Sequence, residues 1–392
     1  MSEWKEYKLG ELGKIVTGKT PPTSQHQNYD GDIPFICIPD LGKSRFIFHT
    51  NKTISKIGLE TVKNCSLPKG SVVVSCIATI GQVGITTKDI SVTNQQINSL
   101  IPDSNLITEE FCYYYFKNLG EDLAQFGGGG SIFEIISKDK FSKVYLTIPS
   151  LPEQTAIASV LSSLDDKIDL LHRQNATLEK MAETLFRQWF VERRPEPVEG
   201  EAKEDWKSKP LSSIAVFLNG LACQKFPPKN NIEKLPVLKI KELSSGITEN
   251  SDWATTDVKP EYIVKNGDVI FAWSASLMVK IWDGQDCILN QHLFKVTSKD
   301  YPKWFYFLWC KHHLDEFIAK AASHATTMGH IKRGDLDKAM VLIPSTKELE
   351  EMTLETEPLI EKIIANNKQI KLLVNLRDTL LPKLMSGEVR IL

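Results

Sequence analysis

The chain has 392 residues, which is more than one hydrophobic core usually organises, so its length predicts at least two domains. Hydrophobic residues make up 42% and charged residues 24% of the sequence, values that exclude general disorder. The formal net charge of -2 argues against a chain that binds nucleic acid unaided through many phosphate contacts, because such a chain carries a larger basic excess. The seven cysteines show no Cys-x-x-Cys spacing, which favours neither a disulfide framework nor a zinc site. No apolar run approaches the roughly 20 residues that cross a bilayer, so a cytoplasmic protein is expected.

The two halves of the sequence repeat each other in order. Trp4 recurs 202 positions later as Trp206, and the run 148–150 recurs 195 positions later as 343–345. Small changes in displacement are what loop insertions produce, so the repeat predicts two similar domains. Further matched pairs are Gly18 and Gly220, Ile33 and Leu235, Pro34 and Pro236, Gly70 and Gly267, and Asn94 and Asn290.

Each half begins with a mixed segment. Short apolar runs rich in β-branched or aromatic residues predict strands at 70–76 and 268–273. Aromatic residues at helical spacing predict packed helices at 109–119 and 303–313. Each half is therefore expected to be a compact α+β domain.

A helix is predicted to follow each domain. Ser150 with Glu153, and Ser345 with Glu348, have the spacing of a capping box, in which the Ser hydroxyl and the Glu carboxylate satisfy free N–H groups of the first turn. Both helices are therefore expected to start at these serines.

Two prolines interrupt the second helix. A proline in a helix interior costs about 3 kcal/mol, so the helix is expected to restart at Pro358, with Thr356 as the candidate cap. Pro382 is expected to kink or end it.

Apolar residues at spacings of three and four predict a coiled-coil seam on each helix, with a polar position in each seam. The two seams are expected to pack together as an antiparallel two-helix coiled coil. The predicted seam residues are Leu164, Ile168, Leu171, Asn175, Leu178 and Leu185 on the first helix, and Leu359, Ile363, Asn366, Ile370, Leu373 and Leu380 on the second.

These elements predict a fold of the α+β class, in which two similar mixed domains are separated by the paired helices and related by a pseudo-twofold internal repeat. A continuous helix over 166–191 would be about 39 Å long, or about 11 base pairs of DNA. The helices would then act as a spacer, and an ordinary solvated hairpin that ties two domains together is the alternative. The predicted division is a first domain at 1–150, a spacer helix at 151–192, an exposed Pro-, Glu- and Lys-rich linker at 193–205, a second domain at 206–345 and a second spacer helix at 346–392.

With these features in place, the whole chain resembles the specificity subunit of a type I restriction-modification system. The stretches that carry the resemblance are 18–22, 70–75, 94–97, 149–154 and 185–191. The resemblance implies two target-recognition domains, each reading one half of a bipartite, asymmetric DNA target, with the unread gap set by the paired helices. It also implies that two modification (methyltransferase) subunits dock on the helices and that restriction or translocase subunits can join. Catalysis, S-adenosylmethionine, ATP and magnesium then belong to the partners, and this chain has no catalytic residue.

Bases are read in the grooves by amide, guanidinium and hydroxyl groups, so polar loops at matched places in the two domains are the candidate DNA-binding residues. Asn94 and Gln95, with their repeats Asn290 and Gln291, are interpreted as structural instead, because they recur unchanged in domains expected to read different bases. The candidates are Lys19, Thr20, Gln25, Ser75, Thr79, Gln82, Gly128 and Ser131 in the first half, and Gln224, Lys225, Trp273, Ser274, His324, Thr326, Thr327, His330 and Lys332 in the second.

Two other functions stay open. A stand-alone DNA methyltransferase would need an Asn/Asp-Pro-Pro-aromatic tetrad to hold the flipped base, and the sequence has none. The run 13–20 matches a phosphate-binding loop, but Pro21 and Pro22 follow at once and remove the backbone donors of the helix that such a loop needs. A coiled-coil scaffold that binds proteins rather than DNA would keep the helices but does not need two reader domains.

Overall fold

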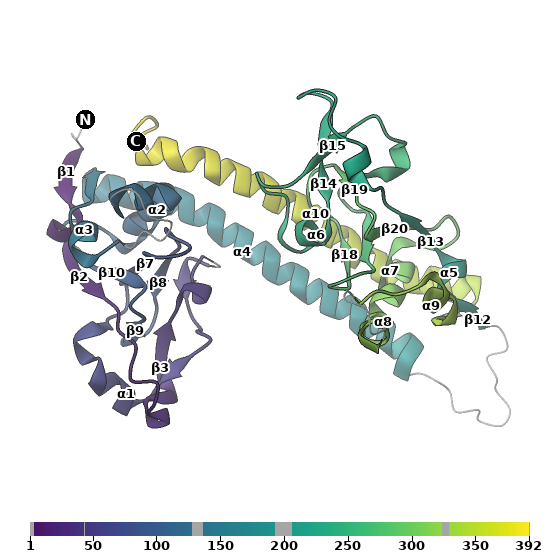
Figure 1. The fold of residues 1–392 in the computed structure, drawn as a ribbon, viewed down its shortest axis with the longest axis horizontal. Coiled ribbons are helices and arrows are strands. Elements are labelled where there is room, and N and C mark those ends of the chain that lie inside the picture. The colour runs from purple at the N-terminus through teal and green to yellow at the C-terminus, as the bar shows by residue number, and fades with distance from the viewer. Residues whose placement is uncertain (1–3, 43, 128–135, 193–205, 324–328, 392) are drawn as a thin grey trace. The chain divides into compact units, whose positions relative to one another are not determined.

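The computed structural model describes residues 4–42, 44–127, 136–192, 206–323 and 329–391. The chain forms two compact units: unit 1 consists of Met1–Asp169 and Leu373–Leu392, and unit 2 of Leu170–Leu372. Each unit therefore contains one domain of the repeat and part of both long helices (Figure 1). The predicted domain limits at residues 150 and 345 remain predictions.

Unit 1 has three sheets. Its five-stranded sheet has the order β2 (Gly13–Thr17), β10 (Ile97–Pro102), β7 (Val72–Ser75), β8 (Val83–Thr86) and β4 (Phe46–Ile47). Its four-stranded sheet has the order β5 (Thr53–Ile54), β3 (Tyr29–Ile36), β9 (Ser91–Thr93) and β6 (Ser66–Leu67), and β1 (Lys5–Lys8) pairs with β11 (Tyr145–Ile148). The short helices are α1 (Lys56–Thr61), α2 (Glu109–Leu119) and α3 (Lys138–Ser142).

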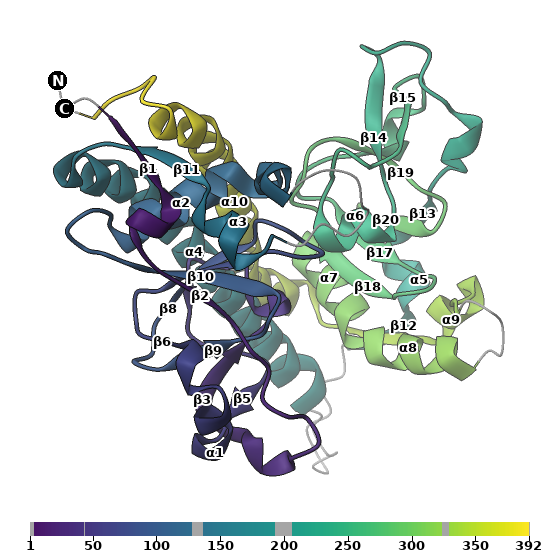
Figure 2. The same ribbon diagram turned by 60° about the vertical axis from the view of Figure 1, so that its left-hand side comes forward.

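Unit 2 has the same plan. One four-stranded sheet has the order β13 (Val216–Asn219), β20 (Leu293–Thr297), β17 (Val269–Ala272) and β18 (Met278–Ile281). The other, shown in Figure 2, has the order β15 (Trp253–Thr255), β14 (Lys234–Leu238), β19 (Cys287–Leu289) and β16 (Ile263–Val264), and β12 (Lys207–Pro210) pairs with β21 (Met340–Ile343). The helices are α5 (Leu211–Ile214), α6 (Ile240–Ser245), α7 (Lys303–His312), α8 (Leu314–Ser323) and α9 (Arg333–Lys338).

The sheets confirm the predicted repeat, because strands at matched places in the chain occupy matched places in the sheets. In both four-stranded sheets of this second type the central pair is parallel, β3 with β9 in unit 1 and β14 with β19 in unit 2. The backbone N–H of Gly18 donates to Ile97, and that of Gly220 donates to Leu293, both at 3.1 Å. The predicted strands and helices in each half are also present, as β7, β17, α2 and α7.

The cores lie where aromatic helices cover sheets. In unit 1, Phe111, Tyr114 and Phe116 of α2 are fully buried, and in unit 2 Trp304 and Phe305 of α7 are fully buried. These side chains belong to core clusters that also contain buried residues of the long helices. Full burial of one large apolar side chain stabilises the fold by roughly 1.5–3 kcal/mol, so these contacts hold the domains onto the long helices. All seven cysteines are free.

The long helices are α4 (Leu151–Arg187), followed by a π-helical turn over Gln188–Glu192, and α10 (Thr346–Met385). The prediction that the second helix restarts at Pro358 is wrong, because α10 runs through it without a break. Thr356, the predicted cap, is fully buried within the helix. Pro358 removes one backbone hydrogen bond, but neighbouring Ile360 packs into the core of unit 2, and this burial offsets the loss. The helix ends three residues after Pro382, whose carbonyl accepts the N–H of Ser386 at 3.0 Å.

The predicted capping box of Ser345 and Glu348 forms. The Glu348 N–H donates to the Ser345 hydroxyl and the Ser345 N–H donates to the Glu348 carboxylate, both at 3.3 Å. At the start of α4 the Glu153 carboxylate accepts the indole N–H of Trp4 at 3.3 Å. Among the described residues, none of the helices is both long and apolar enough for a membrane span.

Candidate nucleic-acid interface

The long helices pair through their predicted seams. All the predicted seam residues are buried or half-buried. In unit 2 the Asn175 amide N–H donates to the Asn367 carbonyl at 2.6 Å, and its carbonyl accepts from Asn366 at 2.9 Å. Such a polar pair in an apolar seam fixes the register of two helices, because a shifted partner would leave buried amides without hydrogen bonds.

Replacing Asn175 with leucine is expected to destabilise unit 2 by about 1–3 kcal/mol, because the buried Asn366 amide loses its partner. The double variant Asn175→Leu and Asn366→Leu should recover most of this loss, since two apolar groups then meet in the seam. Urea unfolding followed by circular dichroism measures both. A double variant that is less stable than the single one would contradict the hydrogen bond that Asn366 donates to Asn175.

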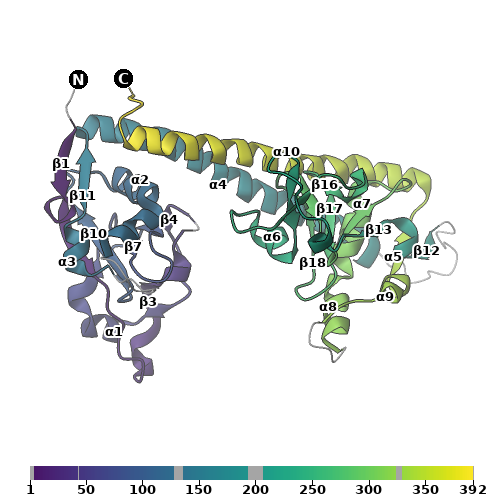
Figure 3. The same cartoon turned by 45° about the horizontal axis from the view of Figure 1, so that its top comes forward.

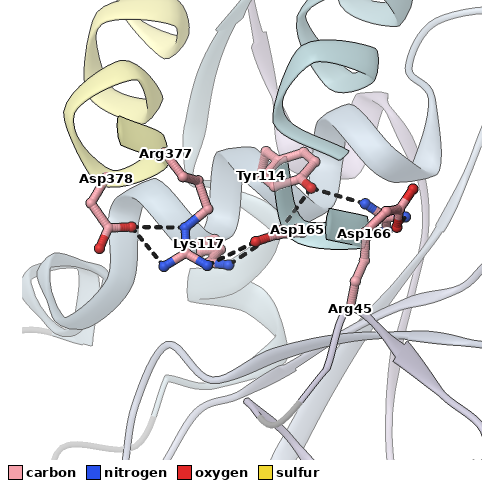
Figure 4. Close-up of polar contacts among 7 residues, drawn as sticks. All are labelled: Arg45, Tyr114, Lys117, Asp165, Asp166, Arg377 and Asp378. Atoms are coloured by element: carbon pink, nitrogen blue, oxygen red, sulfur yellow. Dashed lines mark hydrogen bonds and ion pairs between the residues drawn. The ribbon is translucent and has the colours of Figure 1, made fainter. Parts of the chain in front are cut away.

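In unit 1 a cluster of charged side chains joins the same two helices to the domain (Figure 4). The Arg377 guanidinium of α10 donates to the Asp165 carboxylate of α4 at 2.7 Å, and Tyr114 of α2 donates its hydroxyl hydrogen to the same carboxylate at 2.8 Å. Arg45 in turn donates to the Tyr114 hydroxyl at 3.0 Å and contacts Asp166 at 2.8 Å. The cluster therefore fastens the end of α10 to α4 and α2.

The contacts within unit 1 also give the direction of the helices. Asp165 lies against Arg377. Glu153, which lies nearer the start of α4, is 4.0 Å from Arg390, which lies nearer the end of the chain. Residue numbers thus fall along one segment as they rise along the other. The two segments therefore run antiparallel in this unit (Figure 3).

The electrostatics of the cluster centre on Asp165. Burial by itself raises the pKa of this carboxyl, but the charge of Lys117 and the hydrogen bonds from Arg377 and Tyr114 outweigh burial, and the pKa lies below its ordinary value. For Lys117, burial lowers the pKa more than Asp165 raises it. The Lys117–Asp165 distance of 3.5 Å is also longer than the Arg377–Asp165 distance of 2.7 Å, so Arg377 is the principal partner of Asp165.

A tryptophan and a glutamate tie each domain to the helix that follows it. Trp4 donates to Glu153 in unit 1, and Trp206 donates to Glu348 at 2.8 Å in unit 2. These pairs are repeats of each other, although the sequence analysis identified the tryptophans and the glutamates separately. The tryptophan and the glutamate both recur in the second half of the sequence, and this recurrence was the signal that could have indicated their contact.

The first set of candidate DNA-binding residues lies on the surface. Lys19 and Gln25 are exposed in unit 1, and Thr20 donates its hydroxyl hydrogen to Gln95. Gln224 and Lys225 are exposed in unit 2. The four exposed side chains, Lys19, Gln25, Gln224 and Lys225, have the hydrogen-bonding groups that base edges require, whereas Thr20 is half-buried.

The second set divides into buried and exposed members. Ser75 is fully buried, and its hydroxyl bonds the Thr79 carbonyl and accepts from the Gln82 N–H at 2.8 Å. It therefore shapes the turn after β7, while the Thr79 side chain is exposed and that of Gln82 is half-buried. Ser274 is similarly buried and bonds His292 at 3.1 Å. Polar residues at strand ends are as useful for closing a turn as for binding, which is why sequence alone did not separate these roles.

The structure brings three candidates of unit 2 together. Trp273 is half-buried, stacks on Phe294 with ring centroids 5.6 Å apart and donates its indole N–H to Asn219 at 3.1 Å. Its ring also lies 6.4 Å from that of His330, which forms a β-bridge with Ser274. Lys332 is exposed two residues later. The candidates Gly128, Ser131, His324, Thr326 and Thr327 and the linker at 193–205 lie outside the described residues.

A surface hollow in unit 2 contains residues that are not among the predicted candidates. It is lined by Gln224, one of the candidates, together with Lys239, Asp252 and Trp253. Lys239 and Asp252 form an ion pair, and the Trp253 side chain is 40% exposed with the Lys234 ammonium 4.8 Å from its ring centroid. No signal in the sequence indicates this hollow, because only the folded sheet brings positions 224, 239 and 252 together.

The asparagines interpreted as structural shape turns. The Asn94 carbonyl accepts the Gln96 N–H at 3.1 Å, and the Asn290 carbonyl accepts the His292 N–H at 3.3 Å. In the described stretch 4–42, the run 13–20 forms strand β2 over Gly13–Thr17 and no α-helix starts directly after it, so it is not a phosphate-binding loop. Within the described residues, no three His, Cys, Asp or Glu side chains are placed to hold a metal ion.

Comparison with known proteins identifies relatives over the full chain. The model of the family described as "Type I restriction modification DNA specificity domain" matches residues 1–180 and 203–375. The MjaIX type I restriction enzyme specificity subunit of Methanocaldococcus jannaschii is 31% identical over 99% of this chain and 94% of its own. The EcoDI specificity subunit of Escherichia coli is 22% identical over 99% of this chain and 89% of its own. The crystal structure of the type I restriction-modification S subunit from M. genitalium has a similar fold, with a TM-score of 0.59 and 14% identity over 98% of this chain and 96% of that chain.

Proposed function

Because the chain belongs to the family of type I restriction-modification specificity subunits, we propose that it selects the double-stranded DNA sequence on which such a complex acts in the cytoplasm. Each α+β domain reads one half of a bipartite, asymmetric target. The paired helices α4 and α10 set the unread gap between the half-targets. Two modification subunits bind the chain, restriction or translocase subunits can join, and S-adenosylmethionine, ATP and magnesium bind to these partners.

One observation carries this proposal: the chain has two domains of one topology whose exposed side chains differ. The strand order recurs between the units. The loop that contains Lys19, Thr20 and Gln25 in unit 1 is matched in unit 2 by a loop that starts at Leu221, and there Gln224 and Lys225 are the exposed polar residues. Two domains that share a topology but differ in their exposed polar side chains are suited to recognise two different DNA sequences. A scaffold that binds proteins through its helices would not require this duplication.

Mapping modified bases in DNA from cells that carry the complete system tests the proposal. We expect one bipartite sequence to be modified, and we expect modification at that sequence to disappear when this chain is deleted while the partners are kept. Exchanging residues 206–345 for the same domain of another family member should change one half-target only. Modification at unchanged sites after this exchange would contradict the proposal and favour a scaffold.

A further inference from the structure

The repeat supplies an internal alignment at the level of single backbone hydrogen bonds. The Phe35 N–H donates to the Lys52 carbonyl at 3.1 Å, and the Val237 N–H donates to the Asp252 carbonyl at 2.7 Å. In the adjacent ladder Pro34 faces Thr53 in unit 1, and Pro236 faces Trp253 in unit 2. Positions 37, 52 and 53 of unit 1 therefore match positions 239, 252 and 253 of unit 2.

The side chains at these matched positions differ in charge and size. Unit 2 has Lys239, Asp252 and Trp253, whereas unit 1 has Cys37, Lys52 and Thr53. The charge at 52 and 252 is reversed, although the backbone around it is the same. Ordinary surface residues also diverge, but here the divergent residues of unit 2 line one hollow together with Gln224. Side chains that differ between the units while the backbone stays the same, and that gather in one hollow, are what a specificity-determining site requires.

The hollow offers a donor and an acceptor that suit a G·C base pair, because lysine commonly bonds guanine O6 or N7 and a carboxylate commonly accepts from cytosine N4. Lys239 and Asp252 form an ion pair in which both side chains stay accessible, with 39% and 61% of each exposed. A lysine ammonium has three N–H donors, and a carboxylate has two acceptor oxygens, so each group can keep its partner and bond a further group. In the major groove a G·C pair presents the O6 and N7 acceptors of guanine beside the N4 donor of cytosine. A lysine next to an aspartate presents the complementary donor and acceptor.

We propose that Lys239 and Asp252 read a G·C base pair in the half-target of unit 2, in a hollow with Gln224 and with Trp253 as its apolar wall. This inference rests on the proposed function and adds to it the residues and the kind of base pair. Lys234 holds the Trp253 ring from one side, so the wall is in place before DNA arrives. In unit 1 the same positions carry a lysine without an aspartate and therefore read a different pair.

The test uses the complete complex with its modification subunits and a set of duplexes in which each base pair of the target is replaced in turn. Lys239→Met and Asp252→Ala should each lower the preference for G·C at one position of one half-target by roughly tenfold or more, the fold-change expected when one side of a bidentate base contact is lost. The preferences at all other positions, including the whole second half-target, should stay unchanged. Lys52→Met in unit 1 should affect the other half-target only.

A matched control is present in the same unit. Lys229 and Asp257 form an exposed ion pair, with 64% and 74% of their side chains exposed, and neither lines the hollow. Lys229→Met and Asp257→Ala should leave every base preference unchanged. Asp252→Asn, which keeps the size of the side chain, serves as a second variant if Asp252→Ala lowers the thermal stability of the complex.

Two results would overturn the inference while leaving the proposed function intact. One is an unchanged preference at every position in both hollow variants, and the other is an equal loss of affinity for all duplexes, which is typical of a phosphate contact. A wild-type complex without any base preference would instead overturn the proposed function itself. Relaxation at an A·T position rather than a G·C position would overturn the assignment of the base pair.

Discussion

Replacing Arg377 with alanine is expected to destabilise unit 1 by about 3 kcal/mol, the lower end of the range for removing one partner of a buried ion pair. The Arg377 and Asp165 side chains are only 15% and 11% exposed, so water cannot fully replace the guanidinium. Tyr114 and Lys117 remain near the carboxylate and limit the loss. Hydrogen exchange of the α2 amides measures the effect, because it reports the free energy at which this unit opens.

The repeat supplies the control for this variant. At a displacement of 195 residues, Ala182 corresponds to Arg377 and Ile360 to Asp165, and both are buried in the core of unit 2. The double variant Arg377→Ala and Asp165→Ile should be more stable than Arg377→Ala, because replacing a buried ion pair with apolar side chains is often neutral. A double variant that is less stable than the single one would show that Asp165 does not depend on Arg377.

The same comparison has a defined pH dependence. The pKa of Asp165 in the folded chain lies below its ordinary value of 3.8, so the stability it contributes is fully present above about pH 4. It is lost as the pH falls through the lowered pKa, because the protonated carboxyl no longer attracts Arg377. The difference in stability between the wild-type chain and Arg377→Ala should therefore shrink below pH 4. A difference that stays constant down to the acid unfolding of the chain would contradict the ionic pairing.

Local patterns predicted much of the fold because periodicity and caps depend on near neighbours. The aromatic spacing predicted α2 and α7, and the Ser345 box forms as its spacing indicated. Pro358 was misjudged because its local cost is known from the sequence, whereas the compensating burial of Ile360 depends on contacts with the rest of unit 2. The pairing of Arg377 with Asp165 could not be found from spacing, because Asp165 lies beside the seam residues of the first helix and is not one of them.

The candidate site was predictable to a smaller extent. Gln224 and Lys225 are exposed, as expected of a polar loop, but the burial of Ser75 and Ser274 did not follow from their polar character. A hydroxyl at a strand end can face water or close the turn, and only the turn geometry decides between these. The hollow around Trp253 could not be predicted, because its lining residues come from separate strands and loops that the sheet brings together.

Inserting four residues into each long helix is expected to widen the gap in the recognised DNA by about two base pairs. Four residues lengthen an α-helix by about 6 Å, and one base pair of B-DNA rises by about 3.4 Å. Suitable places are after Leu170 in α4 and after Leu372 in α10, where both leucines are exposed and lie outside the predicted seams. The inserted residues should continue the three-and-four spacing of the seam. Mapping of modified sites in cells that carry the variant reads out the gap directly.

Insertion into one helix alone separates spacing from pairing. If only α4 is lengthened, either Asp165 loses Arg377 or Asn175 loses Asn366, because both pairs join the same two helices in a fixed register. That variant should lose stability and modification, whereas the paired insertion should keep both half-targets and change only the distance between them. An unchanged gap in the paired variant would mean that the helices hold the domains without measuring the DNA. Half-targets that stay constant while the gap widens would show that reading is a property of the α+β domains and spacing a property of α4 and α10.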